Sequence, residues 1–262
     1  MRTPPRREGT IWLPRPNAAA AIRLFCFPHA GGWSGSFNPL VECAPPDFEM
    51  ALMEVPGRGT CSRDAAPKTI DDLVRTWGEA IARRLSDHSR CVFFGHSMGA
   101  LLAFEVQHWL LEHVGRGADD LVASSARAPD VLVQNLEYSA HDLHHDDFLV
   151  RRLEAMGGTP DEVLAHEELR EMVLALYRLD LSLLASYVHR ERVPLAARVF
   201  ALGGADDPFV PAQALDRWQL HANSPVTVDV FAGGHFYLYE QSAVVLARLR
   251  CLLTGEGAQT SP

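Results

Sequence analysis

Residues 91–100 read CVFFGHSMGA, and this stretch decides the fold of the chain. Its first four residues form an apolar run typical of a buried strand, and residues 99–111 have the pattern of a helix. A Gly-x-Ser-x-Gly sequence between a strand and a helix predicts a nucleophile elbow, a sharp turn that exposes a serine hydroxyl at the end of the strand. Gly95 and Gly99 provide the small side chains that such a turn needs. We therefore predict that Ser97 is a catalytic nucleophile.

Strand-like and helix-like segments alternate on both sides of this elbow. Helices between successive strands are typical of a parallel sheet. The sequence thus predicts an α/β fold, with a mostly parallel central sheet flanked by helices. Further strands are predicted at residues 22–27, 50–55, 121–124, 198–202 and 226–231, and helices at residues 71–85 and 242–253.

The alternation is interrupted between about residues 129 and 190, where no strand is predicted. We interpret this segment as a helical lid inserted into a single domain, residues 1–262, whose core is residues 10–128 and 191–254. Residues 255–262 end the chain in small and polar residues and are predicted to be a disordered tail. The helix-favouring parts of the lid are residues 146–156, 161–166 and 167–187, with the sequence GGTP at residues 157–160 as a break.

The composition excludes several classes of protein. A formal net charge of −9 provides no basic footprint for nucleic acid. The apolar runs are strand-length, so we predict no membrane span, and no apolar segment of a secretory signal follows the N-terminus. The five cysteines are scattered without a C-x-x-C pair, which favours a reducing compartment. These features predict a cytoplasmic protein.

Two glycine-rich turns after later strands carry the groups that a serine nucleophile requires. Serine needs a base within hydrogen-bonding reach and a third group that orients the base. After an elbow, these groups follow in the order serine, acid, histidine. We predict His235 as the base and Asp207 as its partner, because the spacing Gly204-x-x-Asp207-x-x-Val210 is common in such acid turns. The adjacent Asp206 is expected to stabilise the turn or to assist within the same loop.

The negative charge that develops during acyl transfer needs converging backbone N–H donors, which form an oxyanion hole. One donor is predicted at Met98, directly after the nucleophile, and the other in the loop FPHAGG, residues 27–32. We predict Ala30 as the second donor, because the two glycines that follow it let the backbone approach a ligand closely. His29 is expected to shape this loop.

The remaining histidines and the arginines carry weaker signals. His96, inside the elbow, is expected to pack beside the nucleophile. The histidines at 141, 144 and 145 lack the carboxylate or cysteine spacing of metal ligands, so we predict a solvated lid surface and no metal. Three arginines can meet a phosphate or an acidic partner, although a solvated surface position is more usual for each of them: Arg58, Arg127 and Arg178.

Together these motifs resemble the type II thioesterases, the discrete editing enzymes of polyketide synthases and non-ribosomal peptide synthetases. The resemblance implies an α/β-hydrolase fold with a helical lid between the sixth and seventh strands. It also implies hydrolysis of acyl thioesters from the phosphopantetheine arm of acyl or peptidyl carrier proteins, by a monomer without a cofactor. The motifs that carry it follow in the family's order: FPHAGG (residues 27–32), VPGR (55–58), GHSMGA (95–100), ARAP (126–129), GGTP (157–160), GADDP (204–208) and GGHF (233–236).

The chain departs from the family pattern at two places near the expected acyl pocket. Residues 175–180, ALYRLD, keep the arginine and the aspartate of the family's lid helix but lack its proline and alanine. Trp33 stands in the oxyanion loop where smaller residues are usual. Both changes concern the choice of acyl group rather than the chemistry. The apolar stripe of residues 167–187 either packs into the core or covers an acyl channel.

Two alternative functions use the same acyl-serine chemistry. One is a carboxylesterase or lipase that acts on free oxygen esters. The other is an acyltransferase or cyclase, in which an amine or a hydroxyl intercepts the acyl group instead of water.

Overall fold

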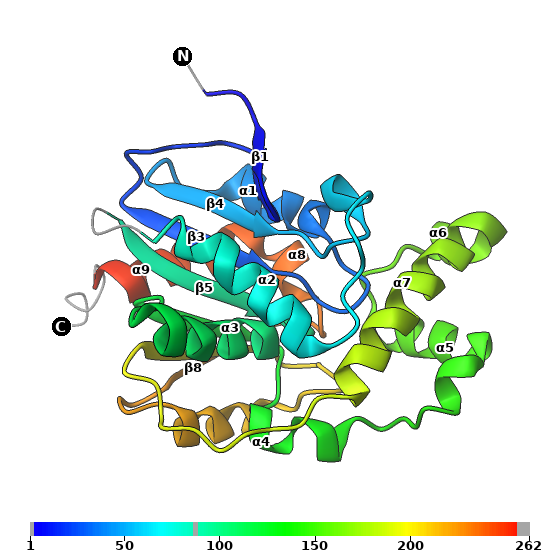
Figure 1. Ribbon diagram of the computed structural model, residues 1–262. Helices are drawn as coiled ribbons and strands as arrows, with labels where there is room; N and C mark the ends of the chain where they lie inside the picture. Colours follow the sequence, from blue (N-terminus) through cyan, green and yellow to red (C-terminus); the bar gives the residue numbers. More distant parts are fainter. Residues whose placement is uncertain (1–2, 86–88, 256–262) are drawn as a thin grey trace.

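The computed structural model describes residues 3–85 and 89–255. Within these residues, eight strands form one central sheet (Figure 1). The strand order is β1-β2-β4-β3-β5-β6-β7-β8. Neighbouring strands from β4 to β8 run parallel, whereas β2 is antiparallel to both β1 and β4. The predicted α/β fold is therefore confirmed. The strands are β1 (Arg6–Glu8), β2 (Ile11–Leu13), β3 (Ile22–Phe27), β4 (Phe48–Met53), β5 (Arg90–His96), β6 (Asp120–Ser124), β7 (Arg198–Gly204) and β8 (Thr227–Phe231).

The parallel strands lie within two residues of the bounds that the sequence predicts. β4 begins at Phe48 rather than at residue 50, and β5 and β7 end two residues later than predicted. The sequence analysis missed β1 and β2, because three residues are too few for an alternating pattern to show. They extend the sheet beyond β4, so β4 is not an open edge.

Helices cover both faces of the sheet, and short 3-10 helices lie in the loops. The 3-10 helices and the shortest α-helices are too short to show a periodic sequence pattern, so most of them were not predicted. The helices are α1 (Asn38–Cys43), α2 (Ile70–Ala82), α3 (Met98–Val114), α4 (Pro129–Leu132), α5 (Asp146–Met156), α6 (Asp161–Ala165), α7 (Glu167–Ala185), α8 (Tyr237–Glu240) and α9 (Ser242–Thr254). The 3-10 helices are η1 (Ser34–Phe37), η2 (Gly59–Cys61), η3 (Val133–Asn135), η4 (Asp142–His144) and η5 (Ala212–His221).

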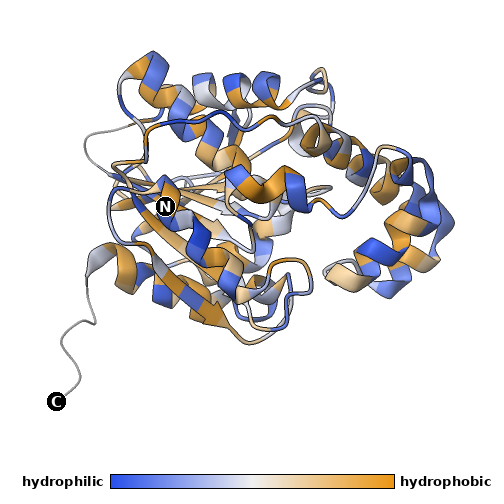
Figure 2. Ribbon diagram, turned by 90° about the horizontal axis from the view of Figure 1, so that it is seen from below, coloured by the Kyte–Doolittle hydropathy of each residue, from blue (hydrophilic) through white to orange (hydrophobic). Residues whose placement is uncertain are grey.

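The strands divide their apolar side chains between two cores because successive residues of a strand point to opposite faces. Phe25 and Phe93 pack with Trp77 of α2 in the first core. Leu24 and Val92 pack with residues of α1 and α9 in the second core. The two buried faces explain why β3 and β5 read as continuous hydrophobic runs, and Figure 2 shows the apolar colour along the strands.

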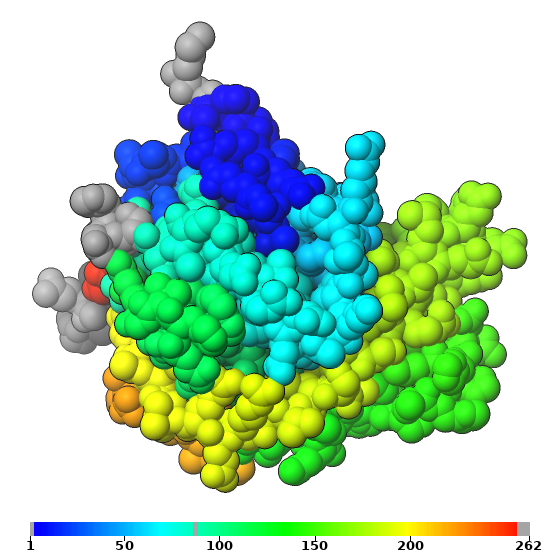
Figure 3. Space-filling model, in the orientation of Figure 1, coloured from blue at the N-terminus to red at the C-terminus, as the bar shows by residue number. Residues whose placement is uncertain are grey.

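A group of helices, α4 to α7, lies between β6 and β7 within residues 129–190. The helix α5 has the predicted bounds, and α7 ends at Ala185 rather than at residue 187. A third apolar core joins α5, α6 and α7, with Leu149, Leu164 and Leu174 among its buried members. In Figures 1 and 3, α5, α6 and α7 project from one side of the body that contains the sheet.

Within the described residues, no helix combines the length and the apolar character that crossing a bilayer requires. Of the predicted tail, residues 256–262 lie outside the described residues, and Gly255, which directly follows α9, has a φ of 73°.

Candidate active site

Ser97 occupies the sharp turn between β5 and α3. Its φ of 55° and ψ of −121° fall in a region that residues with side chains rarely adopt. Such a conformation costs about 1–3 kcal/mol and persists only where the surroundings impose it. Here the Ser97 N–H donates to the carbonyl oxygen of Ser124 at 2.8 Å, which ties the turn to the end of β6.

Gly95 and Gly99 allow this turn to form. A Cβ atom on Gly95 would lie 2.3 Å from the carbonyl oxygen of Gly99, and one on Gly99 would lie 2.0 Å from the carbonyl oxygen of Phe27. Both distances are far below van der Waals contact, and the obstructing atoms belong to the backbone. The two glycines therefore bring α3 against the end of β3, which is the start of the predicted oxyanion loop.

His235 and Asp207 come from the turns after β8 and β7 and are in contact. Nδ1 of His235 lies 2.8 Å from Oδ2 of Asp207, and both side chains are buried. The other carboxylate oxygen, Oδ1, accepts the N–H groups of Phe209 and Val210 at 2.9 and 3.1 Å. Asp206 is exposed. Of the two candidate carboxylates, Asp207 is thus the one that contacts the imidazole.

The surroundings of Asp207 keep it ionised. Burial alone would raise the pKa of its carboxyl group, but hydrogen bonds from His235 and from the backbone, together with the nearby imidazole, lower the pKa below its usual value. A negative charge is therefore available next to Nδ1 of His235. The opposite ring nitrogen, Nε2, is buried and has no hydrogen-bond partner among the described residues.

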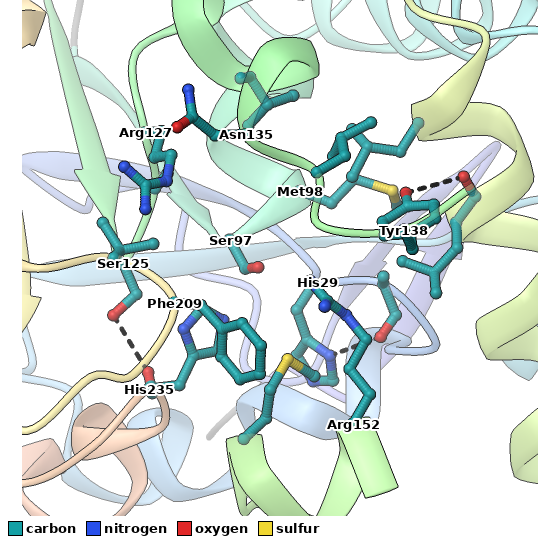
Figure 4. A pocket seen from close by; sticks show the side chains of 18 of the residues that line it. His29, Ser97, Met98, Ser125, Arg127, Asn135, Tyr138, Arg152, Phe209 and His235 are labelled. Carbon is teal, nitrogen blue, oxygen red and sulfur yellow. Dashed lines mark hydrogen bonds between the residues drawn. The ribbon is translucent and has the colours of Figure 1, made fainter. Parts of the chain in front are cut away.

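Ser97 and His235 both line a cavity of about 80 Å³ (Figure 4). Ala30 and Met98, the two predicted backbone donors, also line it. Met98 is the first residue of α3, and the first N–H groups of a helix have no partner within the helix. The remaining lining residues are His29, Ser125, Ala126, Arg127, Leu132, Asn135, Leu136, Tyr138, Arg152, Met156, Tyr177, Leu181, Leu184, Phe209, Val210 and Phe236.

The oxyanion loop is held by Asp180 and Arg58, two residues for which the sequence analysis predicted no such role. The N–H of Gly31 donates to Oδ2 of Asp180 at 2.7 Å. Arg58 takes the acidic partner rather than the solvated surface position: it is 7% exposed and forms a two-point ion pair with the same carboxylate at 2.7 and 2.5 Å. Trp33, expected beside the acyl pocket, is 47% exposed and does not belong to the lining of the cavity.

Ser125 is a functional candidate that the sequence analysis missed. Its Oγ donates to the carbonyl oxygen of His235 at 3.1 Å, and its own φ of 44° is positive. The dashed line in Figure 4 marks this bond. Ser125 directly follows β6 and precedes the ARAP motif. Functional groups of such sheets lie at the carboxyl ends of the strands, and this position was the signal that could have identified it.

Two further histidines near the site are neutral: His29, which lines the cavity, and His96, which lies within the elbow. Burial lowers the pKa of His29 to about 4 and holds the pKa of His96 well below its usual value. Nδ1 of His96 lies 2.9 Å from Oγ of Ser124, which in turn lies 2.8 Å from the hydroxyl oxygen of Tyr237. His96 thus packs beside the elbow, as predicted, and its ring is 5.2 Å from that of His235.

Two further features of the sequence concern possible metal ligands and the apolar stripe of α7. Across residues 3–85 and 89–255, no group of three or more His, Cys, Asp or Glu side chains is placed to hold a metal ion. The stripe on α7 splits, since Leu169, Met172 and Leu179 are exposed, whereas Leu184 lines the cavity.

Comparisons with known proteins identify the family of this chain. The family model for the thioesterase domain matches residues 22–251. The chain is 36% identical, over 233 residues, to a probable cadicidin biosynthesis thioesterase of Streptomyces griseus, covering 87% of this chain and 62% of that longer protein. It is 32% identical to the thioesterase PikA5 of Streptomyces venezuelae over 238 residues, which are 89% of this chain and 82% of the relative.

A solved structure is similar over almost the full length of both chains. The type II thioesterase BorB from the borrelidin biosynthetic cluster matches with a TM-score of 0.81 and 31% identity, over 94% of this chain and 98% of BorB. The resemblance inferred from the motifs is confirmed. A family match from β3 to α9, on a sheet that carries a serine elbow, makes this chain a member of the thioesterase family, a group of α/β-hydrolase enzymes that cleave thioesters.

Proposed function

We propose that the protein hydrolyses acyl thioesters on the phosphopantetheine arm of acyl or peptidyl carrier proteins. It thereby removes aberrant or stalled acyl groups from a polyketide or non-ribosomal peptide synthase. The observation that carries the proposal is the 2.8 Å contact between His235 and Asp207 in the wall of the cavity that Ser97 also lines. The biosynthetic names of the relatives support a carrier-bound substrate.

The first half of the reaction transfers the acyl group to Ser97. Nε2 of His235 accepts the hydroxyl proton while Oγ of Ser97 attacks the thioester carbonyl carbon, and Asp207 stabilises the imidazolium that forms. The N–H groups of Met98 and Ala30 bind the oxyanion, and one such donor contributes about 2.7–4 kcal/mol to the transition state. The C–S bond then breaks, and the thiol of the carrier arm leaves with the proton from His235.

The second half returns the enzyme to its resting state. A water molecule donates a proton to Nε2 of His235 and attacks the acyl-serine carbonyl carbon. The ester bond breaks, Ser97 recovers its proton, and the carboxylic acid leaves. Because a thiol is a better leaving group than an alcohol, we expect this second half to limit turnover.

The helices between β6 and β7 act as the lid in this proposal, because α5 and α7 and the loop before them supply one wall of the cavity. Tyr138, Arg152, Met156, Tyr177 and Leu181 all come from this segment. A closed wall excludes water until the acyl group is seated. The enzyme acts as a cytoplasmic monomer that meets its carrier protein transiently.

Hydrolysis of loaded carrier protein, followed by intact-protein mass spectrometry, tests the proposal. Short, long and decarboxylated acyl chains are compared on one carrier, with the same acyl groups on a simple oxygen ester alongside. We expect rapid release from the carrier and loss of about a million-fold in the Ser97→Ala variant, which retains the fold. Intact carrier thioesters beside cleaved oxygen esters would instead identify an esterase. An amide or a lactone among the products would identify an acyltransferase or cyclase.

A further inference from the structure

Arg152 of α5 reaches into the cavity that contains Ser97. Its guanidinium carbon lies 4.6 Å from the ring centre of Phe209 and 5.2 Å from that of Tyr138, and both rings also line the cavity (Figure 4). Two aromatic faces therefore hold a cation in a fixed orientation. The sequence analysis did not single out this residue.

No acidic group of the described residues forms an ion pair with Arg152. Its Nε atom is buried without a hydrogen-bond partner, and the residues that line the cavity include no aspartate or glutamate. Arg58 and Arg178 differ in this respect, because Arg58 is paired with Asp180 and Arg178 with Asp146. Arg127 also lines the cavity and, like Arg152, has no ion pair among the described residues.

The two tyrosines next to Arg152 are neutral. Burial raises the pKa of Tyr138 and of Tyr177, although the charge of Arg152 opposes this effect. His29 is uncharged above a pH of about 4. A partly desolvated cation without a counter-ion is costly, and an anion that enters the cavity relieves this cost.

We propose that Arg152 binds a carboxylate carried by the acyl group, so that the substrates of this enzyme include thioesters of dicarboxylic acids. This inference rests on the proposed function. The planar guanidinium donates two parallel hydrogen bonds to a carboxylate, which neutral acyl chains cannot accept. Leu181 and Leu184, on the adjacent helix α7, provide apolar contacts for the methylene groups of the chain.

The phosphate of the carrier arm is the other anion available, but its position disfavours it. The whole pantetheine chain separates this phosphate from the sulfur atom. Arg152, by contrast, lies near the reacting centre, because its partner Phe209 has its ring centre 6.1 Å from that of His235. An acyl carboxylate lies within a few bonds of the thioester, so it can reach Arg152 while the thioester carbonyl lies at Ser97.

The test compares each dicarboxylic acyl group with its neutral amide of the same length on one carrier protein: malonyl with malonamyl, succinyl with succinamyl and glutaryl with glutaramyl. For at least one pair we expect the wild type to favour the acid in kcat/KM by about tenfold or more, as hydrogen bonds to a charged group imply. Arg152→Gln removes this preference, because it lowers kcat/KM for the acids by far more than for the amides. Arg151→Gln, an exposed neighbour on the same helix, leaves both unchanged.

Three outcomes overturn the inference. The first is a wild type that does not prefer the acid in any pair. The second is an Arg152→Gln variant that loses equal activity on acids and amides. The third is an effect of Arg152→Gln that disappears with N-acetylcysteamine thioesters, which lack the phosphate, because it would assign Arg152 to the carrier arm. The wild-type comparison needs no variant, so it decides even if Arg152→Gln does not fold.

The same experiment separates this inference from the proposed function. A wild type that cleaves amide-bearing thioesters without preferring acids refutes only the role of Arg152. A wild type that cleaves no thioester, charged or neutral, refutes the proposed function and this inference with it.

Discussion

The carboxylate of Asp180 in α7 holds Gly31 of the oxyanion loop. Its Oδ2 accepts the Gly31 N–H at 2.7 Å, and the same carboxylate is paired with Arg58. Asp180 is completely buried. The helix that forms one wall of the cavity is thus bonded directly to the loop that carries Ala30.

This relationship predicts that Asp180→Asn damages both stability and turnover. Loss of the charge leaves Arg58 buried and unpaired, so we expect the free energy of unfolding to fall by about 3–5 kcal/mol. We also expect a lower kcat, because the loop loses its anchor. Urea unfolding and thioester hydrolysis measure the two effects. Asp146→Asn is the control, since its pair with Arg178 is exposed and should contribute less than about 1 kcal/mol.

The contact between Asp207 and His235 predicts a large difference between two adjacent aspartates. Asp207→Asn removes the acceptor that orients Nδ1, and we expect kcat to fall by about 10⁴-fold with little change in KM. Asp206→Asn, which changes an exposed carboxylate, should leave kcat within about twofold. Steady-state kinetics on one acyl thioester distinguish them. Equal losses in both variants would contradict the assignment.

His108 predicts how stability depends on pH. Burial and then the charge of Arg192 lower its pKa to about 4, so the folded protein favours the neutral ring. Since the unfolded chain binds the proton more readily, this contribution is complete above about pH 6.5 and is lost as the pH falls from there to about 4. We expect a shallower loss of unfolding free energy over this range in His108→Gln. Identical slopes for the two proteins, measured by urea unfolding, would disprove this origin.

The close approach at Gly99 predicts an intolerant position. A Cβ atom there would meet the carbonyl oxygen of Phe27 at 2.0 Å, so Gly99→Ala must move backbone and should cost at least about 1–3 kcal/mol. Gly234→Ala is a suitable comparison, because its nearest obstructing atom would be 3.9 Å away. Thermal unfolding of both variants provides the measurement. A Gly99→Ala protein as stable as Gly234→Ala would mean that the elbow relaxes without cost.

The sequence predicted the features whose signal is local. The elbow at Ser97 depends on residues within a few positions of each other, and the strands β3 and β5 are buried on both faces, so each reads as an apolar run. The order of the motifs along the chain then sufficed to predict His235, and the spacing within the acid turn favoured Asp207 over Asp206. These predictions needed no knowledge of which helix lies above the site.

The features that escaped prediction are contacts between distant segments. Arg58 and Asp180 are 122 positions apart, and nothing in either neighbourhood indicates the pair beyond the motifs that contain them. Arg152 reads as an ordinary charged residue of an amphipathic helix, because its aromatic neighbours come from residues 138 and 209. Periodicity also cannot detect β1 and β2, which are only three residues long.

The positive φ of Ser97 strains the fold at the residue whose hydroxyl group the proposed reaction needs. Glycine adopts its positive φ without strain, so Ser97→Gly would relax the turn while removing the only atom that the proposed reaction needs there. The substitution that stabilises the fold at this position is therefore the one that abolishes the activity. Selection for activity has to retain serine there against this thermodynamic preference.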